Sequence, residues 1–152
     1  MTVAGRLAEL GIELPPVVPP VAAYIPAMAH GDVVQTSGQL PMVAGELPAT
    51  GKVGAEVTAE DAKGLARQCA LNALAAAADA VGGVDRITGV LKVTGFVASV
   101  PAFTGQPGVI NGASEVLGEI FGDAGRHTRS AVGVPVLPLD APVEVEVAFL
   151  YA

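Results

Sequence analysis

The chain has 152 residues, of which 51% are hydrophobic and only 15% are charged. This length suits one ordinary domain, and this much apolar surface can offset the entropy lost on folding, which excludes a disordered chain. The formal net charge is −7, and the eight basic residues are scattered. Non-specific nucleic-acid binding is therefore not expected, because it needs Lys and Arg to neutralise phosphates. The low share of charge also predicts that some apolar surface is buried between subunits.

Location and metal binding can be addressed from a few residues. Residues 1–10 contain Arg6 and no apolar run, and no stretch approaches the roughly 18 apolar residues of a membrane span, so a cytoplasmic protein is expected. Cys69 is the single cysteine and lies among Ala and Leu, so we interpret it as a small buried residue. With one Cys and two separated His, the sequence predicts no metal site.

The N-terminal segment predicts a short helix and then an extended arm. Residues 3–10 place Leu7 and Leu10 on one side of a helix. Residues 14–20 include four prolines, which exclude a helix there. We therefore divide the chain into an N-terminal helix with a Pro-rich arm, residues 1–20, and a main domain, residues 21–152.

The main domain alternates strands and helices. Strands are expected at residues 22–26 and 32–37, with a turn at His30-Gly31-Asp32 between them. Thr58 is a typical N-cap for a helix that ends at about Val81, before two glycines. A strand at 87–99, a helix at 109–121 and strands at 129–136 and 143–150 complete the order. This order predicts an α+β fold in which two helices cover one face of a mostly antiparallel or mixed sheet.

The last strand separates two kinds of side chain. Successive side chains of a strand point to opposite faces of the sheet. One set suits the helix-covered core, and the other places two carboxylates on the opposite face, which is either wet or covered by another subunit. The core set is Val143, Val145, Val147 and Phe149, and the other set is Glu144, Glu146, Ala148 and Leu150.

Several motifs, in order and in spacing, resemble the RidA/YjgF family over about residues 24–152. The C-terminal run is similar to its signature, and the helical and strand-to-loop motifs agree with it. Two further segments resemble a longer subgroup, which is often named endoribonuclease L-PSP or translation inhibitor. The segments are TRSAVGV at 128–134, LP at 137–138, VEVE at 143–146, TSGQLP at 36–41, CALN at 69–72, and, for the subgroup, NGAS at 111–114 and GRHTR at 125–129.

The resemblance implies a fold, an assembly and an activity. The fold is a chorismate-mutase-like α+β protomer of the Bacillus chorismate mutase and YjgF type. Three protomers form a homotrimer with a central barrel, and ligand sites lie in the clefts between neighbours. The family's archetype hydrolyses 2-aminoacrylate and related imines or enamines to 2-oxo acids and ammonia. It uses no metal or organic cofactor, so the expected partner is a small carboxylate-bearing ligand, with neither membrane nor nucleic acid.

Arg129 and Glu144 match the two charged positions of the family's site. A guanidinium binds a carboxylate through two parallel hydrogen bonds, so Arg129 is expected to hold the substrate. The alternative is a structural ion pair with Glu144 or Glu146. Glu144 is expected to orient or deprotonate water, or to protonate the imine nitrogen, and the alternative is a solvated strand residue. A nearby arginine predicts a lowered pKa for Glu144, which favours orientation over base catalysis.

Five more residues are candidates for substrate binding. Tyr24 precedes Ser37 by 13 positions, as the family's site tyrosine precedes its serine. Ser37 and Gly38 offer hydroxyl and backbone donors, and the alternative is a core tyrosine and a strand end. Asn111 either faces the cleft or caps its helix. His127 acts as an acid or base, or lies in a surface loop.

Three functions compete at this point. The leading hypothesis is hydrolytic deamination of small 2-imino or 2-enamino acids. The second is a trimer that binds a small carboxylate without catalysis and regulates or buffers it. The third is the endoribonuclease of the family's older name, against which the acidic balance weighs.

Overall fold

Five strands form one mixed sheet in the order β1-β2-β5-β3-β4. The computed structural model describes residues 1–17, 19 and 22–152. β3 and β4 pair in parallel, and the other neighbours are antiparallel. The predicted α+β class with a mixed sheet is therefore confirmed. The strands are β1 (Ala27–His30), β2 (Val33–Thr36), β3 (Ile87–Ala98), β4 (Thr128–Val134) and β5 (Val143–Tyr151).

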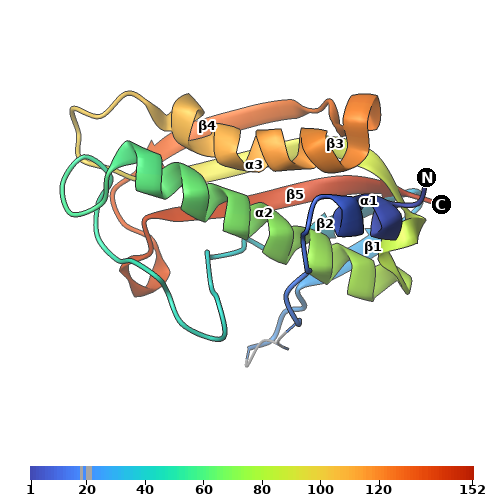
Figure 1. Cartoon of the computed structure of the whole chain (residues 1–152). Coiled ribbons are helices and arrows are strands. Elements are labelled where there is room, and N and C mark those ends of the chain that lie inside the picture. Colours follow the sequence, from blue (N-terminus) through green and yellow to red (C-terminus); the bar gives the residue numbers. More distant parts are fainter. Residues whose placement is uncertain (18, 20–21) are drawn as a thin grey trace.

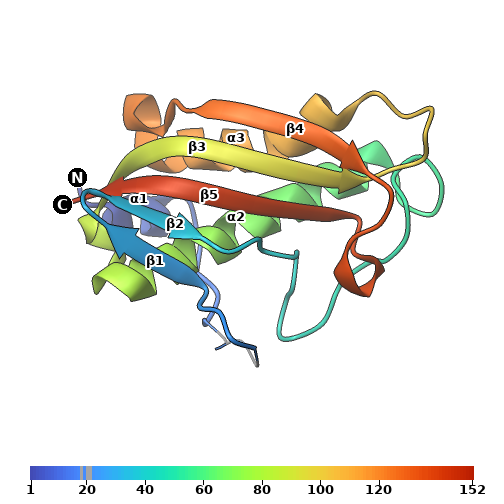
Figure 2. The same ribbon diagram turned by 180° about the vertical axis from the view of Figure 1, so that it is seen from behind.

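Helices cover one face of this sheet and leave the other open. The two long helices, α2 (Ala59–Val81) and α3 (Gln106–Phe121), lie side by side across the strands, and the short α1 (Val3–Glu9) lies beside them (Figure 1). Seen from behind, the strands are in front and no helix of the described chain covers them (Figure 2). None of the helices in the described part of the chain has the length and apolar character of a membrane span.

The ends of α2 are fixed by the residues that the sequence predicts. The Thr58 hydroxyl accepts a hydrogen bond from the backbone N–H of Asp61 at 3.1 Å, which satisfies one of the unpaired donors of the first turn. Gly82 follows the last residue with φ 86°, a left-handed conformation that favours glycine. The predicted cap and stop of this helix are therefore confirmed.

The first strand was predicted too early in the chain. Residues 22–26 are not a strand, and β1 is Ala27–His30 instead. The turn that follows has only two residues, Gly31 and Asp32, because His30 already pairs with Val33. Gly31 has φ 63°, which matches the first position of a two-residue hairpin turn. A turn this short keeps β1 directly beside β2 in the sheet.

The second long helix begins three residues earlier than predicted, at Gln106 instead of 109. Pro107 lies in its first turn, where the missing N–H of proline costs nothing. Asn111 is consequently in the second turn, and of its two alternatives the helix cap is wrong.

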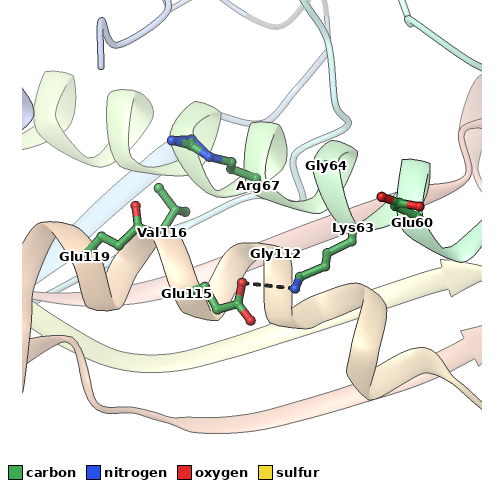
Figure 3. Close-up of a pocket in the computed structure, with 8 residues that line it drawn as sticks. All are labelled: Glu60, Lys63, Gly64, Arg67, Gly112, Glu115, Val116 and Glu119. Atoms are coloured by element: carbon green, nitrogen blue, oxygen red, sulfur yellow. Dashed lines mark ion pairs between the residues drawn. The ribbon is translucent and has the colours of Figure 1, made fainter. Parts of the chain in front are cut away.

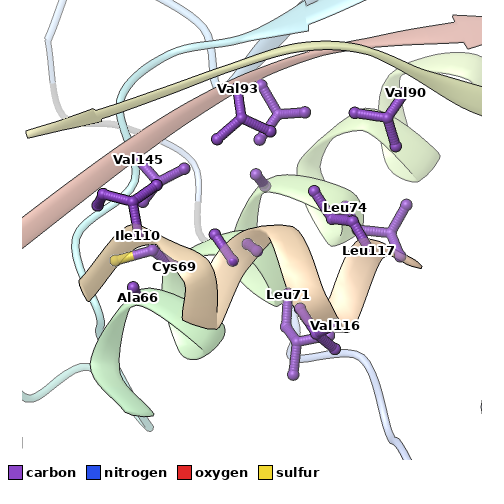
Figure 4. Packing of buried hydrophobic residues seen from close by; sticks show 14 of the residues in the cluster. Ala66, Cys69, Leu71, Leu74, Val90, Val93, Ile110, Val116, Leu117 and Val145 are labelled. Atoms are coloured by element: carbon purple, nitrogen blue, oxygen red, sulfur yellow. The ribbon is translucent and has the colours of Figure 1, made fainter. Parts of the chain in front are cut away.

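The core lies between the helices and the covered face of the sheet (Figure 4). Cys69, Leu74 and Ile110 are fully buried and pack with Val93 and Val145 of the strands. Small residues along α2 allow it to lie close to the sheet and to α3. The predicted alternation along the last strand is confirmed, because its Val and Phe set is buried and its other set is only partly buried.

α1 fastens the N-terminus to the end of α3. The Arg6 guanidinium donates from Nε to the backbone carbonyl of Glu119 at 2.9 Å, and Leu7 is buried. The backbone N–H of Ala4 donates to the Asp85 carboxylate at 2.8 Å. Residues 18 and 20 of the predicted Pro-rich arm and residue 21 of the predicted main domain lie outside the described residues, and the division of the chain at residue 20 stays a prediction.

We predict that Gly112→Ala destabilises the protein by about 2 kcal/mol or more. A Cβ at Gly112 would collide with the backbone carbonyl of Lys63 on α2, and backbone cannot yield as a flexible side chain can. Gly118→Ala is the control, because a Cβ there meets nothing within 4 Å. It should stabilise α3 by up to about 1 kcal/mol. Urea unfolding at equal protein concentration measures both, and equal midpoints would contradict the prediction.

Candidate functional site

Arg129 lies on the helix-covered face and is held by α3. Its Nη1 donates to Asn111 Oδ1 at 2.8 Å and to Ser114 Oγ at 3.2 Å, and its Nη2 donates to the carbonyl of Pro107 at 3.4 Å. These three acceptors fix the guanidinium beside the first turns of the helix. The alternative, a structural ion pair with Glu144 or Glu146, does not occur in the described part of the protomer.

Two of the five donors of Arg129 have no partner among the described residues. A guanidinium has five N–H groups, and the three contacts to α3 use three of them. Both hydrogens of Nη1 are engaged, so the Nε hydrogen and one Nη2 hydrogen have no partner among the described residues. Two donors on one side chain are what a carboxylate needs for bidentate binding.

His127 belongs to the same cluster through a residue that the sequence analysis missed. Its Nδ1 lies 2.7 Å from the carbonyl of Gly125, which only accepts, so Nδ1 carries the proton in the neutral ring. Its Nε2, 2.9 Å from Ser114 Oγ, then accepts from that hydroxyl. Ser114 is one helical turn after Asn111, so helical spacing could have identified it.

Glu144 belongs to a second cluster, on the open face of the sheet. Gln39 exchanges two backbone hydrogen bonds with Val145, at 2.8 and 3.0 Å, and this draws residues 37–39 against β5. A Cβ at Gly38 would lie 2.8 Å from Glu144 Cδ, so only glycine leaves room for this carboxylate. The Ser37 hydroxyl donates to the carbonyl of Ile25 at 2.7 Å.

Tyr24 lies at the margin of this second cluster. It is the residue before Ile25, whose carbonyl receives the Ser37 hydroxyl. Its side chain is 59% exposed, so it is not a core tyrosine in the protomer. The predicted residues therefore divide into Arg129, Asn111 and His127 in one cluster, and Tyr24, Ser37, Gly38 and Glu144 in the other.

The two clusters lie on opposite faces of one sheet. Arg129 is aligned with Val93, and Val93 with Val147, whose side chains are both buried beneath the helices. Glu144 is aligned with Phe96, three residues further along β3 and on the other face. That offset is roughly 10 Å along the strand, with one strand between β4 and β5. Arg129 and Glu144 of the same protomer therefore cannot bind one small ligand.

The pKa of the Glu144 carboxyl is shifted in the opposite direction from that expected for a carboxylate beside an arginine. Partial burial raises its pKa above the ordinary value of 4.5, and the negative charge of Glu146 raises it further. The expected lowering by Arg129 is wrong for the protomer, because the sheet separates the two groups. A raised pKa makes the ionised carboxylate a stronger base than an ordinary glutamate.

Two hollows in the described part of the chain border α3. One, of about 200 Å³, is a groove between α2 and α3 lined by charged side chains, with Lys63 and Glu115 paired at 3.1 Å across it (Figure 3). It contains none of the predicted site residues. The other, of about 490 Å³, lies where β4 ends and α3 begins.

Comparison with known families matches residues 4–152 to the family described as "YjgF/chorismate_mutase-like, putative endoribonuclease". The chain belongs to this family. The resemblance drawn from its motifs is thereby confirmed, and so is the chorismate-mutase-like fold of the protomer.

Relatives of this YjgF-like chain extend over nearly its whole length. Protein TCP17 of Trypanosoma cruzi is 42% identical over 147 residues, 95% of this chain and 91% of that protein. The crystal structure of a putative endoribonuclease from Shewanella oneidensis MR-1 is similar with a TM-score of 0.93 and 34% identity, covering 99% of each chain. E. coli TdcF, crystallised with bound serine, has a TM-score of 0.65 and 25% identity over 90% of this chain and 94% of that one.

We predict that Glu146→Gln lowers the pKa of Glu144, because it removes the second cause of the upward shift. A raised folded-state pKa adds stability that is fully present below the unfolded value and is lost as pH rises through the folded value. The mutant should therefore lose less stability than wild type as pH rises from 4.5 through the folded-state pKa of Glu144.

Carboxyl NMR titration and urea unfolding across this range test it. Glu115→Gln on the outer side of α3 is the matched control and should leave the Glu144 titration unchanged. An unchanged Glu144 titration in Glu146→Gln would contradict the prediction.

Proposed function

We propose that the protein hydrolyses small 2-imino or 2-enamino acids to 2-oxo acids and ammonia, in clefts between the subunits of a homotrimer. One observation carries the proposal: each protomer has two polar clusters on opposite faces of its sheet. One has an arginine with two unpaired donors, and the other has a carboxyl with a raised pKa. A second copy of the chain can bring Arg129 of one protomer to Glu144 of the next.

The open face and the sheet edge support this assembly. Met28 is 56% exposed and Val132 is 44% exposed, which is unusual for large apolar residues on a strand. β4 is the last strand of the sheet, so its outer edge has no strand partner in the described protomer. An edge strand with unpaired backbone groups is a natural place for another chain to pack. Arg129 is on this strand, so a neighbour packed there would lie beside the guanidinium.

The ligand class follows from the donors of Arg129. Two N–H groups of one guanidinium bind the two oxygens of a carboxylate in parallel. E. coli TdcF, a structural neighbour, was solved with bound serine, an amino acid that carries such a carboxylate. A 2-imino acid has the same carboxylate next to its reactive carbon.

The reaction adds water across the C=N bond. Glu144 takes a proton from water as the water oxygen bonds to C2, and the proton passes to the imine nitrogen. The carbinolamine then loses ammonia and leaves the 2-oxo acid. Because the substrate's carboxylate neutralises Arg129, burial and Glu146 continue to hold the pKa of Glu144 up during this step.

We predict that the protein accelerates hydrolysis of imines released by an amino-acid oxidase, measured as loss of semicarbazone formation. Arg129→Ala should lower kcat/KM at least about 100-fold, because it removes a bidentate charged contact. Arg126→Ala is the matched control, since the Arg126 side chain is 87% exposed and its ion pair among the described residues is with Asp123.

Other outcomes point to the competing functions. Binding of 2-oxo acids with no acceleration would replace the enzyme with a carboxylate-binding module. RNA cleavage that survives Arg129→Ala would favour the endoribonuclease of the family description.

We predict that two inactive variants complement each other. Arg129→Ala and Glu144→Gln protomers, mixed by joint unfolding and refolding, form trimers in which one cleft has both native residues. Random mixing makes three quarters of the trimers mixed, so roughly a quarter of native activity should return. Mixing folded trimers without exchange is the control. No recovery after verified subunit exchange would show that the two residues do not meet between protomers.

A further inference from the structure

His127 and Ser114 belong to a hydrogen-bond chain that ends at the guanidinium of Arg129. The chain begins at the carbonyl of Gly125, passes through the His127 ring and the Ser114 hydroxyl, and reaches Arg129 Nη1. The three successive distances are 2.7, 2.9 and 3.2 Å. Of these groups, only Arg129 has a role in the reaction proposed above.

The start of the chain is fixed by backbone packed against backbone. Gly125 is buried, and a Cβ there would lie 2.7 Å from the carbonyl oxygen of Leu117 and 3.1 Å from Gly118 Cα. Glycine therefore allows the 3₁₀ turn Gly122–Gly125 to lie this close to α3. The Gly125 carbonyl consequently keeps a constant position relative to Ser114, which is on the same helix.

The Gly125 carbonyl decides which nitrogen of His127 carries the proton. A carbonyl only accepts, so in the neutral ring the hydrogen is on Nδ1 and Nε2 is an acceptor. Nε2 takes the single hydrogen of the Ser114 hydroxyl, and Arg129 Nη1 donates to a lone pair of the same oxygen. Without His127, the hydroxyl could donate to the carbonyl four residues earlier in the helix, that of Ile110, and turn away from Arg129.

This arrangement decides which edge of the guanidinium remains for a ligand. Asn111 Oδ1 takes one hydrogen of Nη1 and Ser114 Oγ takes the other, so Nη1 is turned toward α3. The edge made of Nε and Nη2 has the two hydrogens that lack a partner in the described chain. Without Ser114, one Nη1 hydrogen has no acceptor on α3, and the guanidinium loses a contact that fixes its orientation.

We propose that Ser114 and His127 are positioning residues: the imidazole, through the serine hydroxyl, keeps the Nε and Nη2 edge of Arg129 turned toward the ligand. The inference rests on the proposed binding of a carboxylate by Arg129. The three acceptors that hold the guanidinium are an amide, a hydroxyl and a backbone carbonyl. None of them is charged, so they orient the arginine and leave its charge to the ligand. A carboxylate in their place would compete with the ligand.

Variants at the serine test its contact with Arg129. Ser114→Ala should raise KM for an oxidase-released imine about tenfold and leave kcat within about twofold, because a misoriented arginine weakens binding of substrate and transition state alike. The Kd of pyruvate, measured by calorimetry, should rise by the same factor. Ser114→Thr keeps the hydroxyl and should keep both values near native. Urea unfolding of each variant shows whether the fold is intact.

A matched pair of variants at the histidine separates its two nitrogens. The side-chain amide in His127→Gln reaches the position of Nε2 and offers an acceptor to Ser114, whereas the shorter amide in His127→Asn reaches only the Gly125 carbonyl. His127→Asn should therefore raise KM as Ser114→Ala does, and His127→Gln should keep it near native. Combining His127→Asn with Ser114→Ala should add nothing further, since both break one chain. His30→Asn, exposed on β1, is the control.

The outcomes separate the positioning role from the proposed reaction. A proton on Nε2 of the neutral His127 ring by heteronuclear NMR, or unchanged KM and unchanged pyruvate Kd in Ser114→Ala, would overturn the positioning role and retain the reaction. Pyruvate binding that Ser114→Ala and His127→Asn weaken equally, without hydrolysis of any imine, would retain the positioning role and reject the deaminase. Failure of the native protein to bind pyruvate would overturn the positioning role together with its carboxylate anchor.

Discussion

The two-residue alternation along β5 decides where the chemical groups of this protein lie. β5 is the central strand, with β2 and β3 on either side. Burial of Val145 and Val147 beneath the helices fixes its register, because a shift by one residue would turn Glu144 and Glu146 into the apolar core. The carboxylates are therefore confined to the face without helices. Arg129 lies on the covered face, so any chemistry that uses both groups depends on a second protomer.

Much of the fold was predictable because local signals and tertiary packing agree. α2 has a side-chain cap at Thr58 and a glycine in the left-handed conformation at its end. β3 is rich in β-branched residues, which favour the extended conformation over its alternatives. The errors lie where local preference is weak. The first strand was predicted at residues 22–26 because apolar residues precede Pro26. The two-residue turn instead requires the strand to continue to His30. The first turn of α3 was missed because Gly and Pro there resemble a loop.

The identities of the site residues were readable from motifs, but the faces on which they lie were not. The side on which Arg129 projects follows from the parallel register of β4 with β3 and from the acceptors of α3, and both are long-range contacts. The pKa of Glu144 was expected to be lowered for the same reason: both residues belong to the motifs, but in the protomer Arg129 and Glu144 lie on opposite faces of the sheet, and the pKa is raised. For Ser114 the sequence shows the face but not the contact. It lies one helical turn after Asn111, which the sequence reveals, whereas its hydrogen bond with Arg129 is visible only in the structure.

α3 is supported at both ends by parts of the chain that lie far from it in sequence. Its early turns hold Arg129, and a carbonyl of its last turn, which has no partner within the helix, receives the side chain of Arg6 from α1. The first nine residues thus brace the helix on which the arginine depends. Exopeptidase trimming of the N-terminus, or a bulky affinity tag fused there, would consequently loosen the turns that hold Arg129 from the opposite end of the molecule.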